Sequence, residues 1–148
     1  MATPEHNMWE RLRAGLYSVV SPKNLRLQRV ETGCAVGVPD VAYSVKWKRR
    51  KAGGWIELKR VKEYPKRSST VIRLTKFTKE QKLFIRLHGR ITKNAFLLVQ
   101  VERDWYLFDH IHIDKIGETA TRSDWELYAV NFWIGGCNFE QLFKEMVR

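Results

Sequence analysis

The chain has 148 residues, with 27 Lys and Arg against 16 Asp and Glu, which gives a net charge of +11. Hydrophobic residues make up 44% of it and aromatic residues 12%, too many for a disordered tail, and its apolar runs are too short to span a bilayer. This length suits one hydrophobic core, so we expect a single domain over residues 1–148. The positive balance favours a partner rich in phosphate, although an anionic membrane surface or a merely soluble basic protein would also agree with it.

The chain contains two cysteines, Cys34 and Cys137. They are too few for a disulfide scaffold, and their spacing is not that of a metal site. No basic-then-apolar signal segment opens the sequence. We therefore expect ordinary intracellular thiols in a cytoplasmic protein, or in the host cytoplasm if the protein is viral.

A helix is expected first. Thr3 is a candidate N-cap with Pro4 at the first helical position. Four apolar residues then recur at helical spacing along one stripe, namely Met8, Trp9, Leu12 and Leu16.

Strands follow this helix. Residues 25–31 are extended in character, and residues 41–47 alternate between apolar and polar side chains, as a half-buried strand does. The basic, glycine-containing run 48–54 predicts a turn, and residues 55–61 predict the next strand. A loop rich in Pro, Lys, Arg and Ser is expected over 63–70.

Thr78 and Gln81 resemble a capping box, so a second helix is expected from there to about His88, with Gly89 as its stop. The remaining elements that we expect are a buried strand at 95–101, its hairpin partner at 105–108, a short helix at 113–117, a strand at 127–133 and a closing helix at 138–147. This order predicts a mixed α/β fold, with a central mixed β-sheet flanked by helices.

Two charged side chains in the strand at 55–61 carry the chemistry. Glu57 and Lys59 are two residues apart, so both leave the sheet on the same side. Asp40, just after a proline, supplies a second carboxylate. Hydrolysis of a phosphodiester needs neutralised phosphoryl oxygens and an activated water, which hard divalent ions held by carboxylates provide. The alternative is a solvated strand face with an ordinary ion pair.

The segment Val38-Pro39-Asp40, followed by Glu57-Leu58-Lys59 on the next strand, resembles the PD-(D/E)xK nuclease superfamily. With Arg29-Val30 before it and Thr78–Gln81 before a helix, residues 5–101 are similar to its virus-type replication-repair (VRR-NUC) and archaeal-type Holliday junction resolvase branches. The resemblance implies a restriction-endonuclease-like core and a Mg²⁺-dependent DNA endonuclease, with Mn²⁺ able to substitute.

The resemblance also assigns roles to residues. It implies that Asp40 and Glu57 are metal ligands, that the main-chain carbonyl of Leu58 is another, and that Lys59 is the catalytic lysine. Gln81 matches a position that the family uses near its site, but a glutamine at the third position of a capping box also has a purely structural explanation.

The family often carries a further acidic residue on its first helix, and two candidates are present. Glu5 lies on the same stripe as the apolar residues and is expected to point inward, where a carboxylate is costly unless it binds something. Glu10 lies on the opposite, solvent face. We therefore expect Glu5 to join the metal ligands; its alternative is a first-turn acid favoured by the helix dipole.

Asp40 comes beside Glu57 only if the pairing of the two strands allows it. A symmetric loop over Lys48–Gly54 would put Glu57 opposite Val45, so we expect the hairpin to open early and Lys46–Gly53 to protrude as a basic excursion, or a bulge to shift the register. The cations that we expect to contact nucleic acid are Arg29, Lys46, Lys48, Arg49, Arg50, Lys51, Arg60 and Lys62.

Two weaker signals stand beside these. His110, His112 and Asp114 would share one face of a strand and could bind Zn²⁺, although a polar strand edge explains them as well. Trp47, beside the basic turn, is a candidate for stacking on an unpaired base.

The resemblance points to branched or four-way DNA as substrate, in phage-type replication, recombination or packaging. The similar branches usually act as dimers, so a homodimer is also an expectation. A non-catalytic basic nucleic-acid-binding protein and a sequence-specific restriction-type nuclease are the alternatives.

Overall fold

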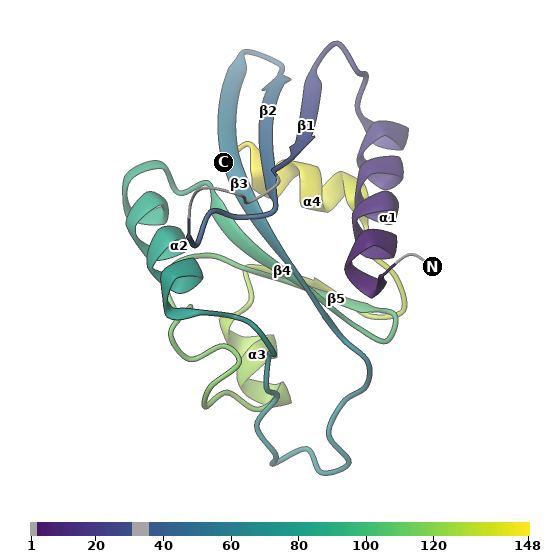
Figure 1. Cartoon of the computed structure of the whole chain (residues 1–148). Coiled ribbons are helices and arrows are strands. Elements are labelled where there is room, and N and C mark those ends of the chain that lie inside the picture. Colours follow the sequence, from purple (N-terminus) through teal and green to yellow (C-terminus); the bar gives the residue numbers. More distant parts are fainter. Residues whose placement is uncertain (1–2, 31–35) are drawn as a thin grey trace.

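A computed structural model describes residues 3–30 and 36–148, and it contains one mixed sheet of six strands in the order β1-β2-β3-β4-β5-β6 (Figure 1). The strands are β1 (Leu25–Arg29), β2 (Val41–Trp47), β3 (Arg50–Val61), β4 (Ala95–Val101), β5 (Asp104–Phe108) and β6 (Asn131–Trp133). The helices are α1 (Pro4–Val19), α2 (Lys79–Thr92), α3 (Arg122–Tyr128) and α4 (Phe139–Met146). Of the strand pairs in the described residues, only β3–β4 is parallel, and α2 supplies the crossover that such a pair needs. The predicted mixed α/β arrangement is confirmed.

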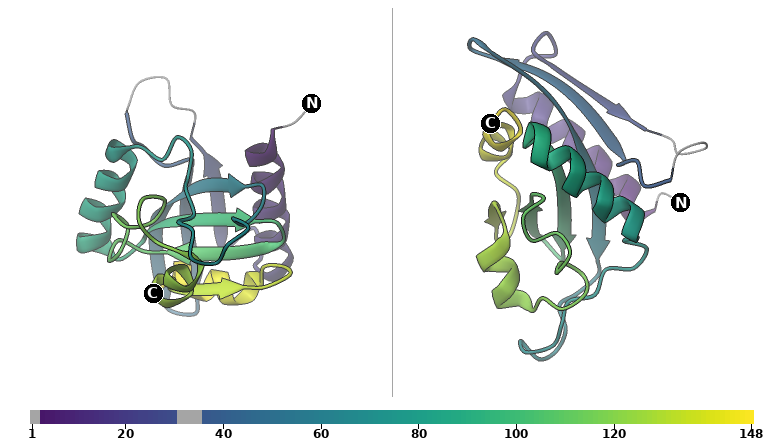
Figure 2. Two further views of the ribbon diagram at one scale, coloured as in Figure 1. Left: turned by 90° about the horizontal axis from the view of Figure 1, so that it is seen from below. Right: turned by 90° about the vertical axis from the view of Figure 1, so that its left-hand side faces the viewer.

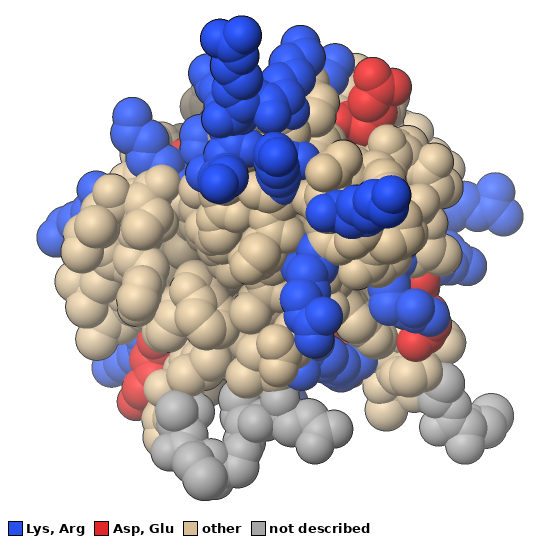
Figure 3. Space-filling view, turned by 90° about the horizontal axis from the view of Figure 1, so that it is seen from above, with Lys and Arg blue, Asp and Glu red and all other residues tan. Residues whose placement is uncertain are grey.

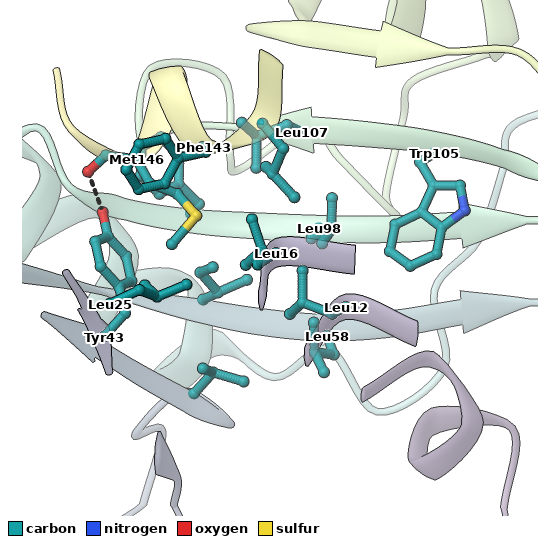
Figure 4. Close-up of a cluster of buried hydrophobic side chains, with 14 of the residues drawn as sticks. Leu12, Leu16, Leu25, Tyr43, Leu58, Leu98, Trp105, Leu107, Phe143 and Met146 are labelled. Atoms are coloured by element: carbon teal, nitrogen blue, oxygen red, sulfur yellow. Dashed lines mark hydrogen bonds between the residues drawn. The ribbon is translucent and has the colours of Figure 1, made fainter. Parts of the chain in front are cut away.

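The helices cover both faces of the sheet, with α1 and α4 on one face and α2 and α3 on the other (Figure 2). The face under α1 and α4 holds a core cluster drawn in Figure 4, where the Tyr43 hydroxyl donates to the main-chain oxygen of Met146 at 2.8 Å. The other face holds a second cluster, to which α2 contributes Ile85 and α3 contributes Trp125. The sheet therefore has two apolar faces, and the strands also carry four buried polar side chains among the described residues: Glu57, Lys59, Gln100 and Asp104.

The first helix agrees with its sequence pattern. The Thr3 side chain accepts a hydrogen bond from the main-chain N–H of His6 at 3.1 Å, and Pro4 begins the helix. The buried residues of α1 are those of the predicted apolar stripe: Met8, Trp9, Leu12 and Leu16.

The β2–β3 hairpin corrects one expectation. Trp47 pairs with Arg50, so the turn is only Lys48-Arg49, with Lys48 at a φ of 57°. The predicted excursion over Lys46–Gly53 is wrong, because β3 begins at Arg50 and runs through the glycines.

Gly53 and Gly54 look like turn residues but belong to β3. Tyr43 pairs with Gly54, and a Cβ atom at Gly54 would lie 2.5 Å from the Tyr43 hydroxyl. A neighbouring aromatic side chain thus fills the space that the glycine leaves. The glycine serves packing within the sheet rather than a turn.

The second helix runs further than expected. α2 continues past Gly89 to Thr92 and ends at Lys93, which has a left-handed φ of 63°. Gly89 lies inside the helix because a Cβ atom there would come within 2.5 Å of the His110 side chain. Close packing, rather than helix termination, explains this glycine.

The last third departs most from the expectations. Residues 113–117 form turns rather than a helix. The expected strand at 127–133 is the end of α3 followed by the short β6. A capping box between Thr121 and Asp124 starts α3, and this signal was present in the sequence. None of the described helices is long and apolar enough to cross a membrane.

Candidate active site

The strand pairing itself brings the two predicted carboxylates together. The β2–β3 ladder ends at the pair Val41–Ile56. One further step in the same register sets Asp40 opposite Glu57, where cross-strand Cβ atoms lie about 5 Å apart. The two-residue turn at Lys48-Arg49 therefore brings Asp40 beside Glu57, for which an excursion over Lys46–Gly53 had been expected.

A glycine-containing loop delivers Asp40 to this position. Gly37 has a φ of 86°, and a Cβ atom there would lie 2.7 Å from the main chain of Glu80, so the loop runs directly against the first turn of α2. Asp40 Oδ2 then accepts a hydrogen bond from the main-chain N–H of Leu58 at 2.9 Å. The Asp40 carboxylate is thus fixed to the middle of β3.

Glu57 is buried and incompletely satisfied. Its side chain is 1% exposed, and its Oε1 atom has no hydrogen-bond partner among the described residues. Its Oε2 atom accepts from Nε2 of Gln81 at 3.2 Å and lies 3.6 Å from the Lys59 ammonium. Burial, together with the negative charge of Asp40, raises the pKa of Glu57 to about 8, against the lowering effect of Lys59. The carboxylate would be stabilised by further positive charge.

Lys59 is held beside this carboxylate by a residue that the sequence did not indicate. Its Nζ donates to the main-chain oxygen of Lys76 at 2.8 Å and lies 5.8 Å from the centre of the Phe77 ring. Lys76 has a φ of 60°, which turns the chain before α2. The contact uses a carbonyl that every residue has, so no side-chain pattern could have predicted it.

Gln81 makes two side-chain contacts, one in the capping box and one with Glu57. Its Oε1 accepts from the main-chain N–H of Thr78 at 3.0 Å, which completes the capping box. The Nε2 end of the same amide donates to Glu57. One side chain therefore starts the helix and contacts the candidate site.

The predicted helix carboxylate is not gathered with the others. Glu5 is exposed in the first turn of α1, so its predicted inward direction is wrong. All four residues of this turn, 4–7, are exposed, because the apolar contacts of α1 begin only at Met8. Glu10 pairs with Arg13 at 3.2 Å. Among the described residues, no third His, Cys, Asp or Glu forms a metal-binding group with Asp40 and Glu57.

A basic groove of about 840 Å³ lies on the open part of the sheet. Lys51 and Gly53, which line it, leave β3 on the same face as Glu57, since strand residues two apart share a face. Other lining residues, among them Tyr17 and Leu25, belong to the core cluster of the opposite face or pack against it. The cations that line it are Lys23, Arg26, Lys46 and Lys51, and no Asp or Glu is among its described lining residues. Figure 3 shows Lys and Arg gathered at this end of the molecule, which carries the β2–β3 turn.

The other predicted basic residues divide between places. Lys48, Arg49 and Arg50 are exposed at the hairpin tip, and Arg29 is exposed at the end of β1. Arg60 and Lys62 instead line a separate pocket together with residues of α1. Trp47 is partly buried, with its ring edge-to-face against Phe143 at 6.0 Å, so packing accounts for much of its surface.

The arrangement on which the zinc alternative depended, three side chains on one strand face, is wrong. His110, His112 and Asp114 lie in turns rather than on one strand face, where His112 stacks on Tyr128 and Asp114 pairs with Arg86 at 2.8 Å.

Of the two cysteines, Cys34 lies outside the described residues. Burial raises the pKa of the Cys137 thiol to about 12. That thiol therefore stays protonated near neutral pH, which makes it a poor metal ligand.

No family model matches the chain, and no curated protein matches it in sequence. Among solved structures, the chain is similar to Hjc of Archaeoglobus fulgidus, a Holliday junction resolvase from an archaeal hyperthermophile. The TM-score is 0.51, with 95% of this chain and 97% of that chain covered at 15% sequence identity. The likeness shows that the mixed sheet with flanking helices is a fold that this chain shares with a resolvase.

Proposed function

We propose that this protein is a metal-dependent DNA endonuclease, with Asp40, Glu57 and Lys59 at its catalytic site. The observation that carries the proposal is the state of Glu57. This carboxyl is buried, lacks a partner for Oε1 among the described residues, and has its pKa raised to about 8. Its pKa stays raised although the Lys59 ammonium lies 3.6 Å away, so a further cation would stabilise the charged form of this buried carboxyl.

The residues present fit a hard divalent ion, Mg²⁺ or Mn²⁺. Such ions prefer oxygen ligands, which the carboxylates of Asp40 and Glu57 would supply. The carbonyl of Leu58 would supply another, because its N–H donates toward Asp40 and the N–H and C=O of one strand residue point to the same side. When bound, the ion neutralises phosphoryl charge and acidifies a bound water.

Lys59 and Gln81 would act on the phosphoryl group and on the carboxylate, respectively. The Lys59 ammonium is fixed by the carbonyl of Lys76 and lies 3.6 Å from Glu57 Oε2. A cation held in this way stabilises charge that develops in the transition state without first reorganising. Gln81 is a positioning residue, since its amide holds Glu57 Oε2 at 3.2 Å.

We propose branched or four-way DNA as the substrate. Two observations support this choice: the fold is that of a protein described as a Holliday junction resolvase, and two cations of the basic groove, Lys46 and Lys51, leave the sheet on the same face as Glu57. Cations in a groove neutralise backbone phosphates whatever the sequence. By the same analogy, the cleavage serves phage-type replication, recombination or packaging.

The proposal includes a homodimer, because a four-way junction is resolved by two cuts. α2 carries an apolar stripe at four-residue spacing, on which Leu83 is 43%, Leu87 47% and Ile91 84% exposed. A second copy packed on this stripe would bring two sites onto one DNA molecule.

The test is incubation of the protein with supercoiled plasmid, linear duplex and a four-way junction, each with Mg²⁺, Mn²⁺ or a chelator. We expect cutting only with metal and fastest on the junction. Binding without cutting under every condition would instead identify a non-catalytic nucleic-acid-binding protein. Efficient cutting of linear duplex at one sequence would identify a restriction-type enzyme.

The matched variants are Lys59→Ala and Lys144→Ala, each of which removes one lysine. We expect Lys59→Ala to slow cleavage by about 10³-fold. Lys144 is exposed on α4, on the other face of the sheet, and its loss should leave the rate unchanged. Undiminished cleavage by the Lys59 variant contradicts the assignment.

A further inference from the structure

A second basic pocket lies on the opposite face of β3 from the candidate site. It measures about 530 Å³ and lies between the first half of α1, the end of β3 and the β4–β5 turn. Arg60 lines it from the strand, one residue after Lys59, so that the two side chains leave the sheet on opposite faces. The charged residues that line it are Arg11, Arg60, Lys62, Glu102 and Arg103.

The cations of this pocket are not neutralised by neighbouring acids. Among the ion pairs of residues 3–30 and 36–148, none includes Arg11, Arg60, Lys62 or Arg103. Arg60 Nη1 instead donates to the main-chain oxygen of Glu102 at 3.0 Å, which fixes the guanidinium against the β4–β5 turn. The only lining acid, the exposed Glu102, leaves a surplus of three positive charges.

A buried side chain at the floor of the pocket also holds the β4–β5 turn. Gln100 is 3% exposed, and its Nε2 donates to the same Glu102 oxygen at 3.0 Å. The β4–β5 turn is thereby held by two side chains on adjacent strands. Such a fixed concave wall with surplus positive charge suits the phosphate groups of a polyanion.

An open strand edge connects this pocket with the candidate site. The β2–β3 ladder ends at Ile56, so no described strand lies beside β3 from Leu58 to Val61 on that side. A nucleic-acid strand that leaves Glu57 and Lys59 can cross this edge and reach Arg60 on the other face. A straight duplex lying on the site face would not make this crossing, because it follows one side of the sheet.

We propose that the Arg11–Arg60 pocket binds the backbone of a second DNA arm, so that a branched substrate folds around the open edge of β3. This inference rests on the proposed nuclease function, which it deepens by naming where each arm lies. The first arm lies along Lys46 and Lys51 of the basic groove, which leave the sheet on the face of Glu57, and the second arm occupies the pocket under α1. Recognition is by phosphates and therefore depends on the shape of the DNA rather than on its sequence.

The test measures binding in chelator, where no cutting occurs, to a four-way junction and to a linear duplex of equal length over a range of salt concentrations. We expect the double variant Arg11→Gln/Arg60→Gln to weaken junction binding by about tenfold and to reduce the salt slope by about two, one for each phosphate that an arginine no longer neutralises. Binding to the linear duplex should change by less than about threefold.

The control is Arg13→Gln/Lys144→Gln, which removes the same charge from α1 and α4 outside the pocket. Arg13 pairs with Glu10 and Lys144 with Glu140, so both DNAs should bind nearly as before. A pocket variant that behaves like this control overturns the proposal. Equal losses on both DNAs also overturn it, because they would place the pocket on a surface that every duplex reaches.

A second pocket variant guards against misfolding. Lys62→Gln/Arg103→Gln changes only exposed side chains and leaves the hydrogen bond from Arg60 to Glu102 in place. It should give the same selective loss of junction binding, with unchanged circular dichroism and Tm. Because binding is measured without metal, failure of the nuclease proposal appears only in the cleavage assay.

Discussion

Two buried carboxylates in this molecule, those of Glu57 and Asp104, differ in how well the protein satisfies their oxygens with hydrogen-bond donors. Asp104 is 7% exposed and has donors on both oxygens: Gly135 N–H on Oδ1 at 2.8 Å and the Tyr64 hydroxyl on Oδ2 at 2.5 Å. The Arg122 guanidinium adds a positive charge 3.7 Å away and stacks on the Tyr64 ring. Glu57 is more deeply buried, lies beside a second carboxylate, and has one oxygen without a partner among the described residues.

The difference separates a structural acid from one that we propose to act in catalysis. Asp104 ties together three distant segments, the loop at Tyr64, the start of α3 at Arg122 and the turn at Gly135, and both of its oxygens accept a hydrogen bond from the protein. Glu57 is compensated only partly, by Lys59 and Gln81. Incomplete compensation costs stability, and it persists where a site must accept something that the protein itself does not carry.

The largest expected effect tests the proposed catalytic role of Glu57. Glu57→Gln keeps the shape of the side chain and removes its charge, so DNA cleavage in Mg²⁺ should fall by at least about 10³-fold, or ~4 kcal/mol. Single-turnover cleavage of a four-way junction measures it. The corresponding change at the structural acid, Asp104→Asn, should leave the rate of the folded protein within about threefold. Similar losses in both variants would remove the distinction.

The structural role of Asp104 predicts that its replacement lowers the stability of the fold. Asp104→Ala leaves the Gly135 N–H and the Tyr64 hydroxyl without their acceptor, which should lower the free energy of unfolding by about 3 kcal/mol. Denaturant unfolding at neutral pH measures the change. Gln81→Ala provides the contrast, since loss of the capping contact should cost only about 1 kcal/mol. An Asp104 variant as stable as the wild type would show that the network contributes nothing.

The smallest expected effect is a dependence of stability on pH. The pKa of Glu57 is raised from 4.5 to about 8 in the folded protein. Its contribution to stability is therefore fully present below pH 4.5 and is lost as the pH rises toward 8, where the folded state must hold the charged form. In chelator, Glu57→Gln should be more stable than the wild type by roughly 2 kcal/mol at pH 8.5, with no gain at pH 4.5.

Thermal unfolding of both proteins across this pH range measures the effect. Divalent metal should reverse the order at pH 8.5, because it stabilises only the protein that keeps both carboxylates. A gain for Glu57→Gln that is constant with pH would show that packing, rather than ionisation, distinguishes the two proteins.

The sequence predicted the parts of the site that depend on local geometry. Strand periodicity placed Glu57 and Lys59 on one face, and the capping pattern placed Gln81 at the start of a helix. The position of Asp40 depended on register, which a two-residue turn sets. That turn was hidden because Gly53 and Gly54 resemble turn residues, whereas Tyr43 from the neighbouring strand explains one of them.

The parts of the fold with a strong local sequence pattern were predictable, and the parts that long-range packing decides were not. The strands at 41–47 and 95–101 have strong patterns and lie where the sequence predicted them. The region from 113 to 133 lacks a clear period, and long-range packing decides it. Trp125 is fully buried beside Tyr106 and Phe108, which holds α3 in place, and the helix runs to Tyr128, past the expected start of the strand at 127.

The double role of the Gln81 amide links the formation of α2 to the formation of the proposed site. The same side chain caps α2 and holds the Glu57 carboxylate, so the first turn of α2 and the proposed catalytic site form together. The groups involved also sit on segments spread from residue 40 to residue 81, whose strand is completed by β4 at 95–101. A molecule in which the first turn of α2 has melted would keep the residues proposed for the site but lose the contact that holds Glu57 Oε2.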